Sequence, residues 1–406
     1  MGRGSADGDR RRAGFPARGL MLAGIVLAAV NLRAVMTGTG PLIGEIRDDT
    51  GLGPAMAGMI GTVPVLCFGL FSVFAPRLGR RFGLDHVLAG ALAVLAAGIL
   101  IRIVPGNVIL FAGTVLIGLA IATGNVILPA AVKRSFPTQV KRLSGLYASA
   151  LSLGASAAAA LAIPLSAAGL GWRGSLAVWA VPALAAAAVW AVLARRRDDD
   201  GPPPPPRIGV AALLRSRLAL AVTLFMATQA LAFYVVLTWL TEIMIDLGLP
   251  RSEAGLVFAV SQLLGVLPII GLSLVAHRVG DDRILVLSAG SVTAAGVLML
   301  LLFGSGGAAA GAILLGLGQG TSFALALTFF VSRAGDDAVA AELSGTGQSV
   351  AYLIAAGGPV LAGATHSLAG AWSPVLIGVG AVVLAQTAIG VIAGRRGTVS
   401  HADLTS

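Results

Sequence analysis

Long stretches that contain no charged residue and no histidine dominate this sequence. They cover residues 50–76, 87–101, 103–132, 143–172, 174–194, 218–241 and 254–276 of the 406-residue chain. A helix that crosses a lipid bilayer needs about 20 apolar residues. Only 11% of the residues are charged, against about 25% in a typical soluble domain. The sequence therefore predicts an all-α membrane protein.

Two further runs are about twice as long as one crossing requires. Residues 284–332 contain a glycine-rich segment at 304–307, and residues 343–394, which only His366 interrupts, contain a Gly/Pro segment at 370–374. Glycine and proline favour turns, so each run is expected to form two helices. With a first span near residues 20–43, the prediction is twelve transmembrane helices.

The basic residues lie mostly on one side of this arrangement. With the amino terminus in the cytoplasm, the opposite side keeps only Arg47, Arg102, Arg173 and Arg251 of the 28 Lys and Arg residues, and Arg33 lies within the first span. Because cytoplasmic loops are enriched in Lys and Arg, we expect a multi-pass protein of the cell membrane with both termini cytoplasmic. The same asymmetry accounts for the net charge of +10 without a nucleic-acid partner.

A hydrophilic segment divides the chain near its middle. Residues 195–217 include three consecutive aspartates and five consecutive prolines, the composition of a stiff linker. The expected parts are a cytoplasmic tail, a six-helix bundle, the cytoplasmic linker, a second six-helix bundle and a second cytoplasmic tail, at residues 1–19, 20–194, 195–217, 218–394 and 395–406.

The two predicted bundles share short strings at a nearly constant offset. Glu45-Ile46 recurs 197 residues later as Glu242-Ile243, and Leu143-Ser144-Gly145 recurs 200 residues later as Leu343-Ser344-Gly345. Since each half has an even number of predicted helices, both copies enter the membrane from the same side, as parallel repeats do. We expect two pseudo-symmetric lobes with a cavity between them.

Six helices followed by six, with a basic loop after the second helix repeated after the eighth, resemble the major facilitator superfamily. Within it, several strings resemble the cyanate and 2-nitroimidazole transporter family: Asn31-Leu32-Arg33, Gly40-Pro41-Leu42, residues 64–70, residues 80–84, residues 124–129, residues 133–137, Thr238-Trp239-Leu240 and residues 348–352. The resemblance implies that two lobes expose a central cavity alternately to each side. The implied solute is a cyanate-like anion, a small carboxylate or a nitro-heterocycle. We expect a monomer that works without a cofactor.

Arg33 is the one charged residue well inside a predicted span. It lies about 20 Å along the first helix from Leu20, in a bilayer core about 30 Å thick, and Glu45 is expected further along the same helix, near the outer surface. An arginine at such a depth costs at least about 2.5–3.5 kcal/mol to insert. We interpret Arg33 as the central solute-binding charge, because its planar guanidinium stays protonated and suits carboxylate-like groups. The alternative is a structural arginine bonded to backbone carbonyls or polar side chains of a neighbouring helix.

Other polar side chains in the apolar runs are candidates to complete the site. Thr37 shares the helix face of Arg33, whereas Asn31 is about 200° away around the helix and is expected to bridge to another helix. The remaining candidates are Asn125, Tyr147, Trp239, Gln262, Gln348 and Tyr352, with Tyr234 and Gln319 of the same kind. Isolated amides and phenols often hold membrane helices together, and Trp239 has the further alternative of an interfacial anchor.

Basic residues at the predicted cytoplasmic side are expected to set the orientation and to hold one conformation of the two lobes. They are Arg77, Arg80 and Arg81 after the second helix, and His277 and Arg278 after the eighth.

Other functions fit the sequence less well. A drug efflux transporter would need a more aromatic cavity and usually a deep acidic residue, whereas aromatic residues make up 5% of the chain. An enzyme would need clustered His, Cys or acidic residues within the bilayer, and Cys67 is the only cysteine, so the sequence predicts no catalysis and no metal site. A membrane sensor or scaffold without transport would leave Arg33 unexplained. The direction of transport and the coupling ion stay open.

Overall fold

The computed structural model describes residues 5–72, 74–136, 139–195, 216–268, 271, 281–335, 337–395 and 397–399. Within these residues the chain is helical, and its only β contact is an isolated bridge between Ala334 and Val399. The predicted all-α class is confirmed.

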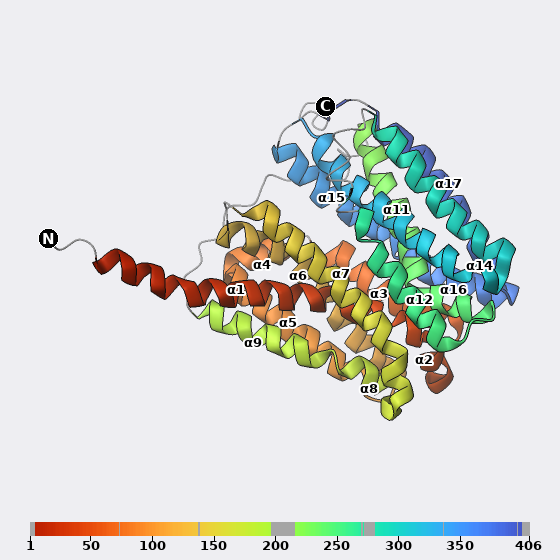
Figure 1. The fold of residues 1–406 in the computed structure, drawn as a ribbon, viewed down its shortest axis with the longest axis horizontal. Helices are drawn as coiled ribbons and strands as arrows, with labels where there is room; N and C mark the ends of the chain where they lie inside the picture. The colour runs from red at the N-terminus through yellow and green to blue at the C-terminus, as the bar shows by residue number, and fades with distance from the viewer. Residues whose placement is uncertain are drawn as a thin grey trace.

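The first half of the chain forms the N-terminal lobe (Figure 1). Its elements are α1 (Ser5–Thr37), η1 (Gly40–Leu42), α2 (Ile43–Thr50), α3 (Pro54–Phe71), α4 (Ala75–Phe82), α5 (Leu84–Arg102), α6 (Asn107–Ser135), α7 (Val140–Leu165), η2 (Ser166–Leu170), α8 (Gly171–Ala177) and α9 (Ala180–Ala194). The second half forms the C-terminal lobe. Its elements are α11 (Arg217–Asp246), α12 (Arg251–Leu264), α14 (Asp282–Ser332), α15 (Asp337–Ala355), α16 (Gly357–Ala369) and α17 (Ser373–Ala393).

Among the described residues, eight helical segments are long and apolar enough to cross a membrane. Two of them, Ser149–Ala194 and Asp282–Ser332, exceed one crossing and leave helical geometry at a glycine. These are Gly169 (φ 96°) and Gly304 (φ 53°, ψ −131°), conformations that glycine adopts readily. α16 likewise ends at Gly370 (φ 67°). The turns expected at 304–307 and 370–374 are confirmed, whereas the number of twelve crossings stays a prediction because residues 272–280 lie outside the described residues.

The first span ends earlier than the sequence predicted. α1 stops at Thr37, and the chain continues through η1, with Pro41 near its start, into α2. Gly38 and Gly40 favour a break and Pro41 has no N–H to continue an α-helix, which explains the difference. Glu45 therefore lies on α2, not on the same helix as Arg33.

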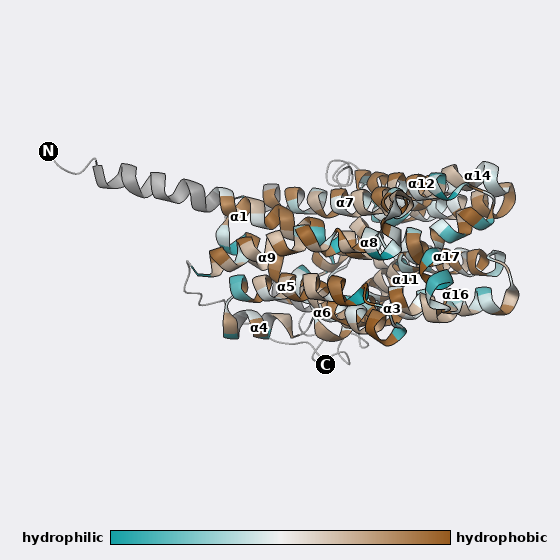
Figure 2. Ribbon diagram, turned by 90° about the horizontal axis from the view of Figure 1, so that it is seen from below, coloured by the Kyte–Doolittle hydropathy of each residue, from teal (hydrophilic) through white to brown (hydrophobic). Residues whose placement is uncertain are grey.

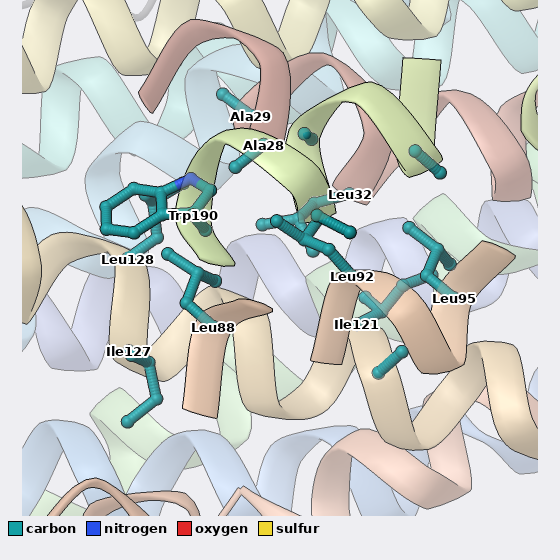
Figure 3. Close-up of a cluster of buried hydrophobic side chains, with 14 of the residues drawn as sticks. Ala28, Ala29, Leu32, Leu88, Leu92, Leu95, Ile121, Ile127, Leu128 and Trp190 are labelled. Atoms are coloured by element: carbon teal, nitrogen blue, oxygen red, sulfur yellow. The ribbon is translucent and has the colours of Figure 1, made fainter. Parts of the chain in front are cut away.

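The N-terminal lobe packs around an apolar core of its own, whereas the apolar clusters of the C-terminal lobe also include residues of the N-terminal lobe, such as Val65 and Ile43. In the N-terminal lobe, Trp190 is fully buried beside Ala28 and Leu128 (Figure 3), and its indole N–H donates to the carbonyl of Gly24 at 2.9 Å. Apolar residues also cover most of the helices' length (Figure 2), and Leu368 is 90% exposed. So much exposed apolar surface fits a protein that faces lipid rather than water.

Ion pairs repeat between the lobes much as the sequence does. Arg134 pairs with Asp85 at 2.5 Å in the N-terminal lobe, and Arg333 pairs with Asp282 in the C-terminal lobe. The two aspartates are 197 residues apart and the two arginines 199. The structure thus repeats this intra-lobe contact at the offset found in the sequence.

The two lobes meet most closely at one end of the molecule. We call this the distal end; it carries α2, α8 and the turn between α11 and α12. The opposite end, which carries α4 with its arginines, is the basic end. Figure 1 shows the helices of both lobes converging toward the distal end and diverging toward the basic end.

Glycines let the lobes approach each other at the distal end. A Cβ atom on Gly58 would lie 2.4 Å from the carbonyl oxygen of Pro359, and one on Gly61 would lie 2.4 Å from Oγ1 of Thr238. Closer to the basic end, the hydroxyl groups of Ser72 and Ser349 lie 3.3 Å apart and join α3 to α15.

Two ion pairs cross the interface at the distal end. Arg47 pairs with Glu242 at 3.7 Å, and Arg251 pairs with Glu45 at 3.3 Å. Glu45 and Glu242 are the counterparts found in the sequence repeat, and each binds an arginine of the other lobe. We call these contacts the distal ion pairs.

Candidate functional site

Arg33 lies on α1 between buried neighbours, Leu32 at 2% and Ala34 at 0% exposure, while its own side chain is half-buried. Its guanidinium carbon is 5.1 Å from the ring centroid of Phe233, which lies on α11 of the other lobe. A guanidinium over an aromatic face is attracted by the ring quadrupole. Arg33 is therefore directed toward the interface between the lobes.

Within the described residues, no carboxylate pairs with Arg33, and its guanidinium makes no hydrogen bond to protein. Its positive charge acts on Tyr147, Tyr234 and Tyr352. These are all three tyrosines of the chain, and they come from three helices, α7, α11 and α15. A fixed charge thus lies among phenol groups from both lobes.

Four aromatic rings at this interface, one of which is the Phe233 ring below Arg33, contact one another in sequence. The ring centroid of Phe68 is 4.4 Å from that of Tyr352, Phe233 is 5.3 Å from Tyr234, and Tyr234 is 6.3 Å from Tyr352. We call Phe68, Tyr147, Phe233, Tyr234 and Tyr352 the aromatic cage. It offers flat apolar faces beside one cation, an arrangement that suits a planar solute with an electronegative group.

Two predicted amides lie beside other predicted candidates. The hydroxyl group of Tyr147 donates to Oδ1 of Asn125 at 3.4 Å, which links α7 to α6. Gln348 lies on α15, one turn from Tyr352, and its amide donates to Oγ of Ser344 at 2.7 Å.

Other predicted candidates make structural contacts instead. Thr37 donates to the carbonyl of Arg33 at 3.0 Å, and Asn31 donates to the carbonyl of Leu27 at 2.7 Å. Both are fully buried, and the described contacts of Asn31 do not include the bridge to another helix that we expected. Its position explains this, because a carbonyl four residues back in the same helix lies within reach. Gln262 is half-buried on α12, with no described contact to Arg33.

Trp239 does not anchor at a membrane interface. It is fully buried, its indole N–H donates to the carbonyl of Pro359 at 2.9 Å, and its ring centroid is 5.0 Å from that of Trp372. It fixes α11 against α16 within the C-terminal lobe.

The basic segment after α3 is a short helix, α4, rather than a loop. Arg77 lies over the ring of Phe74 at 5.7 Å, and Arg81 over Phe82 at 5.2 Å, so the described ring contact of each arginine is with its own segment. The side chain of Arg80, and His277 and Arg278 entirely, lie outside the described residues. Their conformational role stays a prediction.

Sequence reasoning missed Arg102 and the two phenylalanines of the cage. The sequence predicted an exposed loop cation, but Arg102 is only 3% exposed, because α5 extends to this residue and packs tightly on α6. The sequence contained a signal, since Arg102 alone interrupts the charge-free stretch 87–132. The cage had no local signal, because its members meet only through tertiary packing. Within the described residues, no group of three or more His, Cys, Asp or Glu could hold a metal ion.

Comparisons with known proteins agree with this architecture. A family model described as Major Facilitator Superfamily matches residues 25–359. The chain is 37% identical to the 2-nitroimidazole transporter of Escherichia coli (strain K12) over 376 residues, which cover 93% of this chain and 95% of that protein. It is 25% identical to the cyanate transport protein CynX of the same organism, over 86% of this chain and 91% of that protein.

Among solved structures, a bacterial homolog of the human lysosomal transporter Spinster, in an inward-facing and unoccupied conformation, has the same fold. The TM-score is 0.77 at 14% identity, covering 94% of this chain and 98% of that one. The predicted fold and family are confirmed, and the protein is a membrane-embedded transporter of a small solute rather than an enzyme. The chain belongs to the major facilitator superfamily, within which it is related to the 2-nitroimidazole and cyanate transporters.

Proposed function

We propose that this protein carries a small anionic or electronegative solute across the membrane by alternating access, and that Arg33 binds the solute. The observation that carries the proposal is the guanidinium of Arg33, which lies at the interface of the lobes with no carboxylate partner in the described chain. An unpaired charge in protein surroundings is costly, and an incoming anion or electronegative group relieves that cost.

The aromatic cage narrows the solute class within this proposal. Rings from both lobes beside the guanidinium favour a planar solute, such as a nitro-heterocycle or a small aromatic carboxylate, over a bulky one. The relationship to a 2-nitroimidazole transporter supports the same class, and the relationship to a cyanate transport protein supports an anion.

The way the lobes meet supports alternating access as the mechanism. The distal end is closed by glycine-lined contacts and by the distal ion pairs, whereas the lobes diverge toward the basic end (Figure 1). Rocking of the two lobes would break these contacts and open the other side. We further propose a monomer in the cytoplasmic membrane with both termini and the basic end in the cytoplasm, since Arg77, Arg81 and Lys133 lie at that end.

Transport by purified protein in proteoliposomes tests the proposal. We expect uptake of 2-nitroimidazole, cyanate or benzoate by the wild type, and a loss of roughly 30-fold or more in Arg33→Ala, because the charge proposed to bind the solute is removed. Arg33→Lys should retain little activity, since a point charge replaces a planar fork.

Arg217→Ala is the matched control, because Arg217 is an exposed arginine at the start of α11. It should transport like the wild type. Wild-type rates in a folded Arg33→Ala protein would contradict the role of Arg33.

Export of planar drug-like compounds is the second candidate, because all three tyrosines gather at this site although aromatic residues are only 5% of the chain. Cells that produce an exporter would tolerate nitro-heterocycles better than control cells, whereas an importer would sensitise them.

A further inference from the structure

Arg102 is a second buried guanidinium, on the distal side of the aromatic cage. It is the last residue of α5 and is 3% exposed. The pairing of α5 with α6 holds it inside, since a Cβ atom on Gly113 would lie 2.5 Å from the backbone nitrogen of Arg102. Arg102 is thus far from the exposed position that a loop cation would take.

Arg102 has fewer partners than the other arginines expected on this side of the membrane. Arg47, Arg173 and Arg251 have side chains 25%, 32% and 43% exposed, and each pairs with a carboxylate. Arg102 is the most buried of these arginines, and within the described residues it pairs with none. A buried charge needs a counter-charge more than an exposed one does. Contact with solvent therefore does not explain why Arg102 has no described carboxylate partner.

Two of its three guanidinium nitrogens have no described partner. Nη1 donates to Oγ1 of Thr39 at 3.2 Å, while Nε and Nη2 are buried without a hydrogen-bond acceptor among the described residues. The hydroxyl proton of Thr39 is itself donated to the carbonyl of Val35 at 3.0 Å. A single threonine oxygen is therefore the one hydrogen-bond acceptor that the described residues offer to this guanidinium.

Arg102 lines a cavity to which both lobes contribute. Its polar lining comes from Arg102 and Thr39 of the N-terminal lobe and from Tyr234 and Thr238 of α11, and the rest is apolar. In the present conformation it has room for about one water molecule. Because Gly61 of one lobe faces Thr238 of the other, separation of the lobes at the distal end would widen it.

Tyr234 connects this cavity to the cage. It lines the cavity with Arg102, and it lies within the field of Arg33. Thr39, which binds Arg102, lies six residues beyond Arg33, in the turn that follows α1. Tyr234 therefore lies between the surroundings of the two arginines at the interface of the lobes.

We propose that Arg102, Thr39 and Thr238 form a second anion-binding subsite, which takes the anionic or electronegative group of the solute on the distal side of Arg33. A guanidinium with free donors and two hydroxyl groups suits a small planar monoanion such as a carboxylate, nitrate or cyanate. This inference rests on the proposed function for its solute class and not on the role of Arg33. The subsite would receive the solute when the distal end opens.

Nitrate binding to the purified full-length protein tests the subsite directly. Thermal unfolding is followed at increasing nitrate, with gluconate holding the ionic strength constant, because a ligand of the native state raises the apparent unfolding temperature. In Arg33→Gln, which leaves Arg102 intact, we expect saturable stabilisation by nitrate to persist.

In the Arg33→Gln background, Arg102→Gln should then raise the apparent nitrate Kd by about tenfold or more, and Arg102→Lys by about threefold or more, because an ammonium lacks the planar fork. Arg173→Gln in the same background is the matched control, since Arg173 already pairs with Asp49. It should change the Kd by less than about twofold.

Arg102→Lys keeps the buried charge, so it tests the subsite even if Arg102→Gln does not fold. Equal nitrate Kd values in Arg33→Gln with and without Arg102→Lys would overturn the subsite, and so would the lack of saturable stabilisation in Arg33→Gln. Failure of the proposed function would be seen differently, as wild-type transport by Arg33→Gln. That outcome would not change the interpretation of nitrate binding at Arg102.

Discussion

At the scale of single residues, the proposed chemistry depends on two arginines and the aromatic cage. Arg33 stands out in the sequence because it is an isolated charge within a long apolar run. Arg102 lies between two apolar runs. From the sequence alone, an arginine in that position could be an exposed loop residue or a buried residue at the end of a helix. The three tyrosines are separated by more than 80 residues each, so their convergence on Arg33 depends on lobe packing that no local pattern carries.

Glycines at the distal end decide how closely the lobes approach, and Gly58 gives the sharpest test. A Cβ atom there would lie 2.4 Å from the carbonyl oxygen of Pro359. This contact involves the backbone of both helices, which cannot move aside as a flexible side chain could. Overpacking a tight contact typically costs about 1–3 kcal/mol. Gly58→Ala should therefore favour the state with the distal end open, by about tenfold or more.

The rate at which a membrane-impermeant maleimide labels Leu237→Cys from the distal side measures this shift, because Leu237 lines the closed cavity. The native Cys67 does not interfere with the labelling, since it is buried and its thiol donates a hydrogen bond to the carbonyl of Val115. Gly90→Ala, on α5 with no atom near its Cβ position, is the control and should leave the rate unchanged. Unaltered labelling in Gly58→Ala would show that this contact does not hold the distal end closed.

At the scale of elements, α2 is joined to the end of α11 and to the start of α12 by the distal ion pairs. Both pairs are partly exposed, so each contributes on the order of 0.2–1 kcal/mol. Glu45 and Glu242 are related by the internal repeat and each binds an arginine of the other lobe, but Arg47 and Arg251 do not lie at repeat-related positions.

Removal of these carboxylates should open the distal end in steps. Glu242→Gln should raise the labelling rate of Leu237→Cys by up to about fivefold, and the combination with Glu45→Gln should raise it further. Salt should raise the rate in the wild type more than in the double variant, because screening acts on the same charges. An unchanged rate in the double variant would mean that the ion pairs do not stabilise the closed distal end.

Elements were more predictable from sequence than the site was. The helix breaks at Gly304 and Gly370 could be predicted because glycine within a run too long for one crossing has a single plausible role. The early end of α1 and the helical form of α4 were missed. In both cases only a few residues differ from the predicted structure, and the composition of the whole segment fits the predicted span or loop. The contact of Trp239 with Pro359 was missed for another reason, because a backbone acceptor in a distant helix leaves no trace in composition.

At the scale of the whole molecule, a repeated half builds a symmetric frame around an asymmetric site. The ion pairs Asp85–Arg134 and Asp282–Arg333 recur at nearly the same offset in both lobes. The aligned position 197 residues after Arg33, however, is Ala230. A charge in one lobe and aromatic residues largely in the other would give a binding site that forms only when the lobes come together, which is how solute binding would be coupled to their movement.

The structure of the protein with bound 2-nitroimidazole or benzoate tests this account most directly. We expect the solute within the aromatic cage, with its nitro or carboxylate oxygens at hydrogen-bond distance, about 2.7–3.2 Å, from the guanidinium of Arg33. A solute held elsewhere, with Arg33 still free of any bound electronegative group, would contradict it.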